Sequence, residues 1–407
     1  MKTERTSPHR LPRRDFLKSV VTTGGALAAG PLLADSARAA LATADAPSLP
    51  DFRGRNVIIV RFGGGVRRLE TIDAKHTYAP FLCHELSKRG VLFNHMEIDS
   101  LDGIETSHGQ GTLYILTGKY DRFKDVGDKF LGQRFEARVP TVFEYLRRSY
   151  SIPAHQALII NGEDRTDEEF YSFSNHHLFG ASFRSNVLSL YRYKTFLLRR
   201  QIDSGKWFGK DLAKKQRDLA KLEALDYRTK GNDAQGPEIE AFWDRWRQFY
   251  GESGLVNPRG DRLLTELAIR ALKELRPKLL MVNYNDPDYV HWGNLTHYTR
   301  GISIIDDGLR QLVSTIDADA EYRDNTVFVV VPDCGRDTNP LSSVPCQHHF
   351  GSKSSHEIFA LIFGPGVPRN AVVDRRVSQI SLAATIGQFM GFKAEFAEGP
   401  VLAEAIA

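Results

Sequence analysis

The sequence is poor in cysteine and has no long apolar run. It holds three cysteines in 407 residues, Cys83, Cys334 and Cys346, which excludes a small disulfide-stapled scaffold. No segment approaches ~18 consecutive apolar residues, so no membrane span is expected in the mature protein. An excess of one charge is also missing. Seven of the 54 Lys and Arg and three of the 50 Asp and Glu lie in the first 39 residues, so the remainder carries equal numbers of each. Nucleic acid is therefore not expected as a partner.

The N-terminus has the three parts of an export signal. A basic stretch at 13–18 (RRDFLK) is followed by an apolar run at 20–33 and by Ala-Arg-Ala at 37–39. Paired arginines before Phe-Leu-Lys resemble the twin-arginine export signal. This predicts a signal peptide at 1–39, a linker at 40–54 and a periplasmic or secreted protein. The alternative is a basic, alanine-rich tail.

Four apolar runs predict buried strands, and three amphipathic stretches predict helices between them. The runs are 56–62, 278–283, 326–331 and 358–363, and the helical patterns cover 261–275, 298–316 and 378–390. Near-continuous apolar strands are typical of a parallel sheet covered on both faces. The alternation predicts a layered α/β fold, with a core at 55–165 and 256–407. Residues 166–255 read as a mainly helical insertion whose charges form a solvated face.

Polar residues gather where these strands are expected to end. Carboxylates and imidazoles are the ligands of a zinc-like cation, and a hydroxyl beside such a cation can act as a nucleophile. Weaker readings stay open: the acids can cap helices, the histidines can be ordinary loop residues, and Thr106 and Ser107 can form a turn. The candidates are Thr106, Ser107 and His108; Asp286, Asp288 and His291; Asp333, Cys334 and Arg336; and His348, His349 and His356.

The order of these motifs resembles the alkaline phosphatase superfamily, which includes sulfatases. The matching motifs are Asp288…His291-Trp292-Gly293, Asn325-Thr326, Asp333-Cys334-Gly335, the late histidines, and Gly364-Pro365-Gly366. The resemblance implies a three-layer α/β/α sandwich with a mostly parallel sheet. A poorly characterised branch exported through twin-arginine signals is more similar still, on Phe62-Gly63-Gly64-Gly65 and Asp333-Cys334-Gly335-Arg336.

The sequence departs from that family at three points. Gly63–Gly65 stand where the first strand of active phosphatases ends in a metal-binding Asp, and Cys334 replaces a His. Counting back from Thr117 places His108 at the nucleophile position, with Thr106 and Ser107 nearby. The resemblance implies a first metal site made of Asp288 or Asp286, His291 and one of His348, His349 and His356. The second site keeps Asp333, with the Cys334 thiolate, Glu70, Asp73 or Glu105 as substitutes for its lost ligands.

These residues predict an exported metal-dependent hydrolase of phosphate or sulfate esters, acting on a small-molecule substrate. One divalent cation, zinc, is favoured over two. Thr106 or Ser107 would attack the phosphorus or sulfur, and Arg336 would hold the non-bridging oxygens. The alternative is a catalytically inactive binding or scaffold protein that keeps the fold. A third reading places a Cys334–Cys346 disulfide beside an inert pocket.

Overall fold

The computed structural model describes residues 49–101, 103–121, 124–125, 135–162, 178–225, 236–252, 260–291, 294–337, 346–348 and 352–407. The predicted signal peptide, the first part of the predicted linker, and His349 lie outside these ranges. Within them, no helix has the length and apolar character that crossing a membrane requires.

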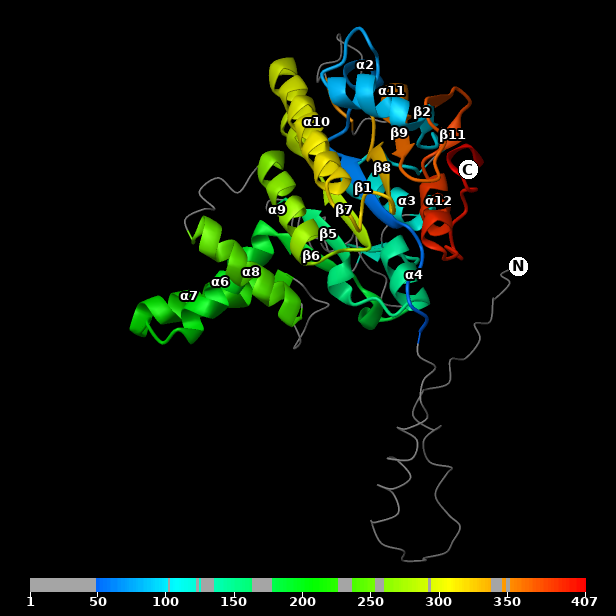
Figure 1. Cartoon of the computed structure of the whole chain (residues 1–407). Coiled ribbons are helices and arrows are strands. Elements are labelled where there is room, and N and C mark those ends of the chain that lie inside the picture. Colours follow the sequence, from blue (N-terminus) through cyan, green and yellow to red (C-terminus); the bar gives the residue numbers. More distant parts are fainter. Residues whose placement is uncertain are drawn as a thin grey trace, which may run out of the picture. The chain divides into compact units, whose positions relative to one another are not determined.

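A nine-stranded sheet forms the centre of the described unit, with the order β10-β2-β9-β8-β1-β7-β5-β6 and with β11 beside β2 (Figure 1). The central strand β1 pairs in parallel with both β7 and β8, and all seven of its residues are buried. The strands are β1 (Asn56–Phe62), β2 (Gly90–Glu97), β5 (Ala157–Asn161), β6 (Asn186–Ser189), β7 (Leu279–Asn283), β8 (Thr326–Pro332), β9 (Glu357–Phe363), β10 (Ala371–Val373) and β11 (Val377–Ser378).

Strand β9 is the exception to the parallel arrangement. It runs antiparallel to both β2 and β8. Its amino end therefore lies at the edge where the parallel strands have their carboxyl ends. This explains how residues that precede β9 in the chain reach the same edge as residues that follow β7 and β8.

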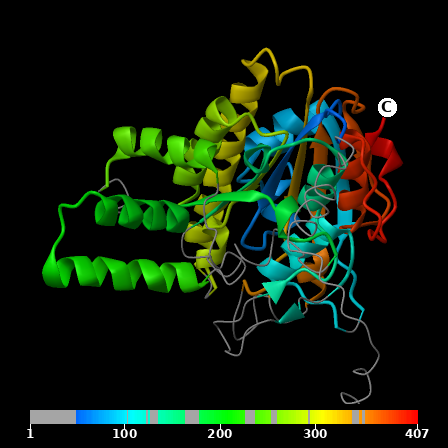
Figure 2. The same ribbon diagram turned by 90° about the horizontal axis from the view of Figure 1, so that it is seen from below.

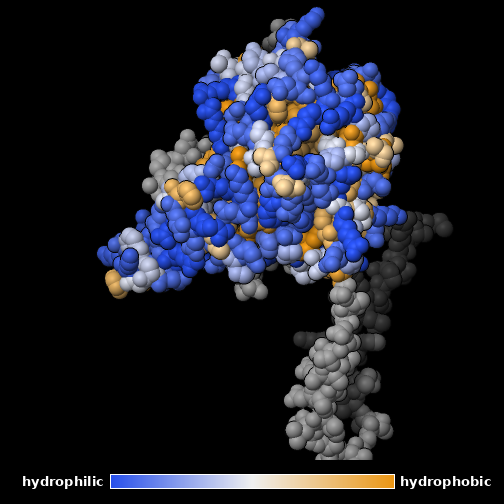
Figure 3. All heavy atoms as spheres, in the orientation of Figure 1, coloured by the Kyte–Doolittle hydropathy of each residue, from blue (hydrophilic) through white to orange (hydrophobic). Residues whose placement is uncertain are grey.

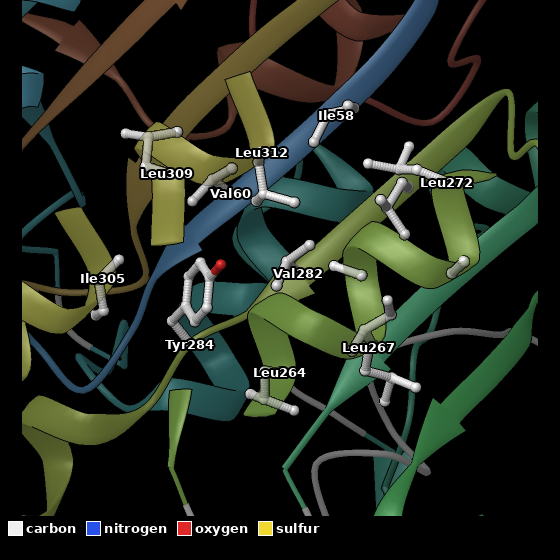
Figure 4. Packing of buried hydrophobic residues seen from close by; sticks show 14 of the residues in the cluster. Ile58, Val60, Leu264, Leu267, Leu272, Val282, Tyr284, Ile305, Leu309 and Leu312 are labelled. Atoms are coloured by element: carbon white, nitrogen blue, oxygen red, sulfur yellow. The ribbon is translucent and has the colours of Figure 1, made fainter. Parts of the chain in front are cut away.

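Two hydrophobic cores cover the two faces of the sheet, because successive strand residues point to opposite sides. Ile58 and Val60 of β1 belong to one core, and Val57 and Ile59 to the other. Figure 4 shows the first core, where β1 and β7 pack against leucines of α9 (Asp261–Glu274) and α10 (Leu295–Asp317). The other face is covered by α3 (His108–Thr117), α4 (Val142–Ser149) and α12 (Ser381–Met390). The predicted mixed α/β fold with a mostly parallel sheet is confirmed.

In its described part, the region predicted as a helical insertion contains three α-helices, the short helix η4 (Ala181–Phe183) and one strand of the main sheet. The α-helices are α6 (Leu190–Asp203), α7 (Gly209–Leu225) and α8 (Pro237–Tyr250), which Figure 2 shows together beyond one edge of the sheet. Strand β6 pairs in parallel with β5. Tyr193 of α6 and Trp243 of α8 lie 5.2 Å apart, ring centre to ring centre, and both belong to the core shared with α9 and α10. The α6 and α8 helices are thus anchored by aromatic packing.

Shorter elements connect these layers. Among them, the one-turn helix η7 is the segment that places Asp288. The face seen in Figure 3 is largely hydrophilic, as a chain with 26% charged residues leads one to expect. The shorter elements are α2 (Arg68–Thr71), η1 (Phe81–Glu85), η2 (Leu86–Arg89), β3 (Lys124–Asp125), β4 (Phe135–Glu136), η3 (Ala154–Gln156), η4 (Ala181–Phe183), η7 (Asp286–Tyr289), α11 (Lys353–His356) and η8 (Ala403–Ala405).

Candidate metal centre

Several chain segments meet at the carboxyl edge of the parallel strands. They are the loops after β1, β7 and β8, the start of α3, and the segment 346–348 that precedes β9 in the chain. Open α/β sheets bind ligands at this edge. The buried side chains of His108, Asp288, Asp333 and His348 lie here, which agrees with the place expected from the sequence.

Three imidazoles converge on one carboxylate oxygen, Oδ1 of Asp288. The Nε2 atom of His291 lies 2.9 Å from this oxygen, the Nε2 atom of His348 lies 3.2 Å from it, and the Nε2 atom of His108 forms a short contact with it. Asp288 and His348 are buried, whereas the His291 side chain is 27% exposed. His291 therefore forms the outer rim of the cluster.

The other ring nitrogen of each histidine lies against an oxygen acceptor. Nδ1 of His108 is 2.7 Å from Oδ2 of Asp333, and Nδ1 of His348 is 3.2 Å from the Thr106 carbonyl. Nδ1 of His291 is 3.2 Å from Oε1 of Gln347, whose Nε2 donates to the His291 carbonyl. A neutral imidazole that donates through Nδ1 carries its lone pair on Nε2. For His291 and His348, neutral rings thus direct lone pairs at a carboxylate, an arrangement that a cation between them would stabilise.

This donor set fits a single zinc-like cation. Ligand bonds of 2.0–2.1 Å in a tetrahedron separate neighbouring donor atoms by about 3.3 Å, close to the spacing between Asp288 Oδ1 and the two imidazole nitrogens. Metal-bound histidines usually donate their second ring nitrogen to a carboxylate, a carbonyl or water, and Nδ1 of His348 and of His291 face the Thr106 carbonyl and the Gln347 side-chain carbonyl in this way. The ligand atoms of His108, Asp288 and His348 all lie within 4.8 Å of one another.

Asp333 has a different environment, since hydrogen-bond donors surround it. Its carboxylate accepts from the backbone N–H of Cys334 at 2.8 Å, of Gly65 at 3.2 Å and of Gly64 at 3.4 Å. The buried Arg61 guanidinium lies 3.8 Å away. Gly64 and Gly65 have φ of +94° and +66°, which other residues rarely adopt. The glycine run supplies amide donors to Asp333.

Burial and nearby charges set the pKa values of Asp333, His108 and Cys334. Burial alone would raise the pKa of Asp333, but His108, its hydrogen bond and Arg61 hold that pKa well below its usual range. Burial opposes a charged His108, yet the charge and hydrogen bond of Asp333 raise the pKa of His108 to about 8. Burial and the Asp333 charge raise the pKa of the Cys334 thiol to about 11. A thiol of this kind resists forming the thiolate that binds zinc.

Arg336 connects the loops of the centre. Its guanidinium is buried and donates to five backbone carbonyls, one for each of its N–H bonds. Two acceptors, Gly64 and Gly65, lie after β1, and another is Cys346, two residues before His348. The remaining two are Pro287 and Val290, around Asp288. All five donors thus bind backbone, so these contacts give no support to the substrate-holding role expected from the sequence.

The start of α3 positions His108. Ser107 caps the helix, its Oγ accepting from the Gln110 N–H at 3.4 Å. Helix and strand approach closely here, since a Cβ on Gly111 would lie 1.9 Å from the Asp333 carbonyl oxygen. The Thr106 hydroxyl donates to the His348 carbonyl and lies 3.2 Å from Ser355 Oγ. Both hydroxyls expected as nucleophiles therefore hold local structure, and His108 is the residue of this segment that enters the cluster.

Other predicted ligands lie apart from the centre. Asp286 accepts from the Asp261 N–H at the start of α9, and Nδ1 of His356 is 3.1 Å from the Ile98 carbonyl. Within the described ranges, no interaction joins His356 to Asp288 or Asp333. Glu70 pairs with Arg67, and Asp73 with His76. The prediction for His349 lies outside the described residues.

The structure does not contain the disulfide that the sequence allowed. Cys83, Cys334 and Cys346 are all free thiols. The third reading, a Cys334–Cys346 bridge beside an inert pocket, is therefore wrong for this structure. The main-chain φ of Cys346 is +63°, and its carbonyl accepts from Arg336 at 2.6 Å.

Three supporting residues were missed from the sequence. Arg61 donates to Thr112 Oγ1 at 2.6 Å and to Asn285 Oδ1, and Gln347 orients His291. Arg61 gave a usable signal, because an arginine inside the apolar run 56–62 requires a buried partner. Asn285 and Gln347 gave none, since amides in loops have many uses.

No protein-family model matches the sequence, and no curated protein matches it either. Solved structures with a similar arrangement include a protein of the alkaline phosphatase superfamily from Vibrio parahaemolyticus (14% identity, 88% of this chain and 73% of that chain, TM-score 0.45). The alkaline phosphatase PafA has 12% identity over 88% of this chain and all of its own, with a TM-score of 0.48. The lipoteichoic acid synthase LtaP from Listeria monocytogenes has 10% identity over 88% and 77%, with a TM-score of 0.46. At these identities the likeness concerns chain arrangement, and the chemistry is argued below from this chain's own residues.

Proposed function

We propose that this protein is an exported, metal-dependent hydrolase of phosphate or sulfate esters that uses one cation held by Asp288, His291 and His348. The observation that carries the proposal is the convergence of imidazole Nε2 atoms on Asp288 Oδ1, with each Nδ1 on an oxygen. Three protein ligands would leave a fourth position open, which is typical of catalytic zinc, provided that His108, whose Nε2 atom also contacts Asp288 Oδ1, does not bind the cation. Nitrogen and carboxylate donors favour zinc over magnesium or calcium.

The charges of the centre suit an anionic substrate. A bound divalent cation would supply positive charge that stabilises the negative oxygen leaving phosphorus or sulfur. Asp288 and Asp333 contribute two negative charges, and the buried Arg61 and Arg336 contribute two positive charges. A divalent cation would therefore give the centre a net positive charge, and His108, whose pKa is raised to about 8, would add to it when protonated. The buried surroundings strengthen the attraction to an anionic ester, because charges interact more strongly away from water.

Export is the other part of this proposal. It rests on the basic, apolar and Ala-Arg-Ala segments in the first 39 residues. Replacing both Arg13 and Arg14 by lysine in the full chain should leave the protein in the cytoplasm of an expression host. Export of this double variant at the wild-type level would contradict a twin-arginine signal.

Metal content and ester hydrolysis test the proposed function. Purified protein spanning residues 40–407 should hold one zinc per chain and hydrolyse para-nitrophenyl phosphate or para-nitrophenyl sulfate. His291→Ala should lower zinc affinity by about 100-fold, since a ligand is lost. His297→Ala is the matched control, because His297 is exposed on α10 and takes no part in the cluster. Protein that binds no zinc and hydrolyses neither ester would contradict the proposal.

A cation-holding binding protein is the second candidate, and burial favours it. The side chains of Asp288, His108 and His348 are at most 5% exposed. A metal with four protein ligands and no open position stabilises a fold without catalysing a reaction. Zinc at one per chain with no hydrolysis of either ester, and a melting temperature that falls on chelation, would establish this candidate over the hydrolase.

A further inference from the structure

We propose that the turn between α6 and α7 docks onto a bilayer that contains anionic phospholipids, by inserting Trp207 and Phe208 among the lipids. The inference concerns a surface outside the candidate metal centre and goes beyond the proposed function. It rests on the position of the turn, on its exposed aromatic rings and on its charge. The helical hairpin that carries the turn is residues 190–225, which comprise α6, the turn at 204–208 and α7.

The hairpin holds its turn away from the sheet. Helix α6 has 14 residues, a length of about 21 Å, and α7 has 17. The Tyr191 hydroxyl at the start of α6 donates to the Leu222 carbonyl near the end of α7, so the turn lies at the opposite end of the hairpin from β6. Figure 2 shows this end at the far left, beyond the sheet. No residue of α7 from Gly209 to Glu223 is buried, and the turn is therefore carried out into solvent.

Two large aromatic side chains are exposed in this turn. Phe208 is 76% exposed and Trp207 is 38% exposed. Gly205 and Gly209 flank them with φ of +65° and +56°, and a Cβ on either glycine would meet no atom within 4 Å. The turn is thus a convex end with open space around it. Figure 3 shows a hydrophobic spot at this end of a mostly hydrophilic projection. Adjacent exposed aromatic side chains of this kind mark an interaction surface.

Positive charge is concentrated in the same hairpin. Residues 190–225 contain ten Lys and Arg but four Asp and Glu, whereas the whole chain after residue 39 contains equal numbers. Lys206, Lys210 and Lys214 are exposed, and no carboxylate of the described residues forms an ion pair with them. Lys215 places its Nζ atom 4.0 Å from the centre of the Trp207 ring. The end of the hairpin therefore presents ammonium groups around two aromatic rings.

This combination suits an anionic bilayer. Tryptophan and other aromatic side chains favour the interface between lipid headgroups and hydrocarbon. The stems of neighbouring lysines can lie along apolar surface while their ammonium groups reach lipid phosphates. Anionic headgroups attract each such lysine, and the attraction falls off within a Debye length. Single-stranded nucleic acid also attracts lysines and stacks on aromatic rings, but its binding sites are grooves that follow the backbone. A convex turn offers no groove, which favours the bilayer.

Vesicle flotation tests the docking. Protein spanning residues 40–407 omits the basic and apolar N-terminal segments, whose own affinity for lipid would mask that of the hairpin. It should float with vesicles made of equal parts phosphatidylglycerol and phosphatidylcholine, and should bind vesicles of phosphatidylcholine alone about 10-fold or more weakly. Raising the salt concentration should weaken binding to the mixed vesicles, because salt screens the lysines. Equal binding to the two kinds of vesicle overturns the inference.

A double variant, Trp207→Ser with Phe208→Ser, tests the aromatic rings. It should bind mixed vesicles about 10-fold or more weakly than wild type, since it has no rings to bury in the bilayer. Phe249→Ser is the matched control, because Phe249 is 69% exposed on α8 and lies outside the hairpin. The control should bind as wild type does. All three side chains are exposed, so both variants should keep the wild-type melting temperature.

A second double variant, Lys206→Glu with Lys210→Glu, tests the charges. Its affinity for mixed vesicles should fall by about 25-fold or more, since each lysine near an anionic surface contributes about fivefold. Lys75→Glu with Lys393→Glu is the matched control, because these lysines are exposed elsewhere and the net charge changes equally. Equal losses in the two double variants would mean that net charge, and not the hairpin, decides binding, and would overturn the inference.

Brominated lipid tests insertion itself. Mixed vesicles made with brominated phosphatidylcholine should quench the tryptophan fluorescence of the wild-type protein. Trp207→Phe should bind these vesicles but lose the quenching, because Trp243 and Trp246 are buried. Binding without quenching, or binding that falls in the lysine variant but not in the aromatic variant, shows attraction by charge alone and overturns the inference.

The competing ligand and the metal centre are tested separately. Tighter binding of single-stranded DNA than of mixed vesicles would assign the hairpin to nucleic acid and likewise overturn the inference. Because the hairpin contributes no residue to the candidate centre, zinc content and ester hydrolysis remain independent tests of the proposed function.

Discussion

The two buried carboxylates at the sheet edge, Asp288 and Asp333, differ in what faces them. Imidazole Nε2 atoms of His291 and His348 lie around Asp288 at 2.9 and 3.2 Å. Backbone N–H groups and a guanidinium lie around Asp333. Donors carrying hydrogen neutralise a carboxylate by themselves, whereas lone pairs facing a carboxylate favour a cation between them. The same residue type, placed after the two strands that flank β1, is thus suited to two different tasks.

The difference arises in the backbone of the two loops. After β1, the left-handed conformations of Gly64 and Gly65 direct amides at Asp333. After β7, the one-turn helix η7 places Asp288 and the nearby His291 on the same side. Under the proposed function, the surroundings of each carboxylate therefore determine which of the two would hold the cation.

Asp288→Asn should have the largest effect. We expect zinc affinity to fall by about 100-fold or more, because the carboxylate on which the imidazole Nε2 atoms converge loses its charge. Chelator competition measures the affinity. Asp286→Asn is the matched control, two residues away in η7, and should leave zinc affinity within about threefold of wild type. An equal loss of zinc affinity in the two variants would show that Asp288 contributes no more to zinc binding than Asp286 does.

Arg336→Lys should disrupt both regions at once, because Arg336 binds the loops after β1 and β7. A lysine has three N–H donors in place of five, so at least two buried carbonyls lose their partner. We expect the free energy of unfolding to fall by about 3 kcal/mol, as measured by urea denaturation. Arg67→Lys, a change in a part-buried pair with Glu70, should cost about 1 kcal/mol or less. A smaller loss in Arg336→Lys than in Arg67→Lys would show that the loops hold without the guanidinium.

Much of the fold was predictable from the sequence. The run 56–62 coincides with β1, and the boundaries of β7, β8 and β9 differ from the predicted ones by one residue. Such agreement follows because strands buried on both faces are apolar throughout. The direction of β9 was not predictable, since a buried strand has the same composition in either direction. Strands β2, β5, β6, β10 and β11 were missed, and β6 gave little periodicity because it has four residues directly before a helix.

The residue types of the centre were predictable from the sequence, but which of the candidate residues enter the centre was not. Asp286 and Asp288 are equivalent in the sequence, and only the turn of η7 separates them in space. His348 and His356 are likewise equivalent until the chain places His356 beside the Ile98 carbonyl. His108 was reached only by counting from Thr117. Its contacts with Asp288 and Asp333 come from residues 180 and 225 positions away, which no local pattern encodes.

Asp333→Asn should separate stability from metal binding. Zinc affinity should stay within about threefold of wild type, because Asp333 faces hydrogen-bond donors rather than the cation. The free energy of unfolding should fall by about 2 kcal/mol, since the buried Arg61 and His108 lose a negative partner. Calorimetry and chelator competition on the same sample measure both quantities. A loss of zinc affinity equal to that of Asp288→Asn would make the two carboxylates parts of one metal site.

Asp319→Asn should have the smallest effect. Its loss in free energy of unfolding measures what a paired carboxylate near solvent contributes. Arg276 hydrogen-bonds Asp319 at 2.6 and 2.9 Å and holds its pKa well below its usual range. A carboxyl whose pKa is lower in the folded state contributes stability that is present above the unfolded pKa of ~3.9 and is lost as the pH falls below it. Because the Asp319 side chain is 28% exposed, solvent screens the pair, and we expect a loss of about 0.5–1 kcal/mol at pH 7.

The pH dependence of this loss is the decisive measurement. Urea denaturation should find the difference between wild type and Asp319→Asn shrinking steadily below about pH 4. Asp324→Asn serves as the control, since the Asp324 side chain is 86% exposed and should show almost no loss at either pH. A loss at pH 7 that matched or exceeded the loss in Asp333→Asn would mean that burial beside His108 and Arg61 adds nothing to a carboxylate. Asp333, which is buried among hydrogen-bond donors, would then stabilise the fold no more than Asp319, whose ion pair is screened by solvent.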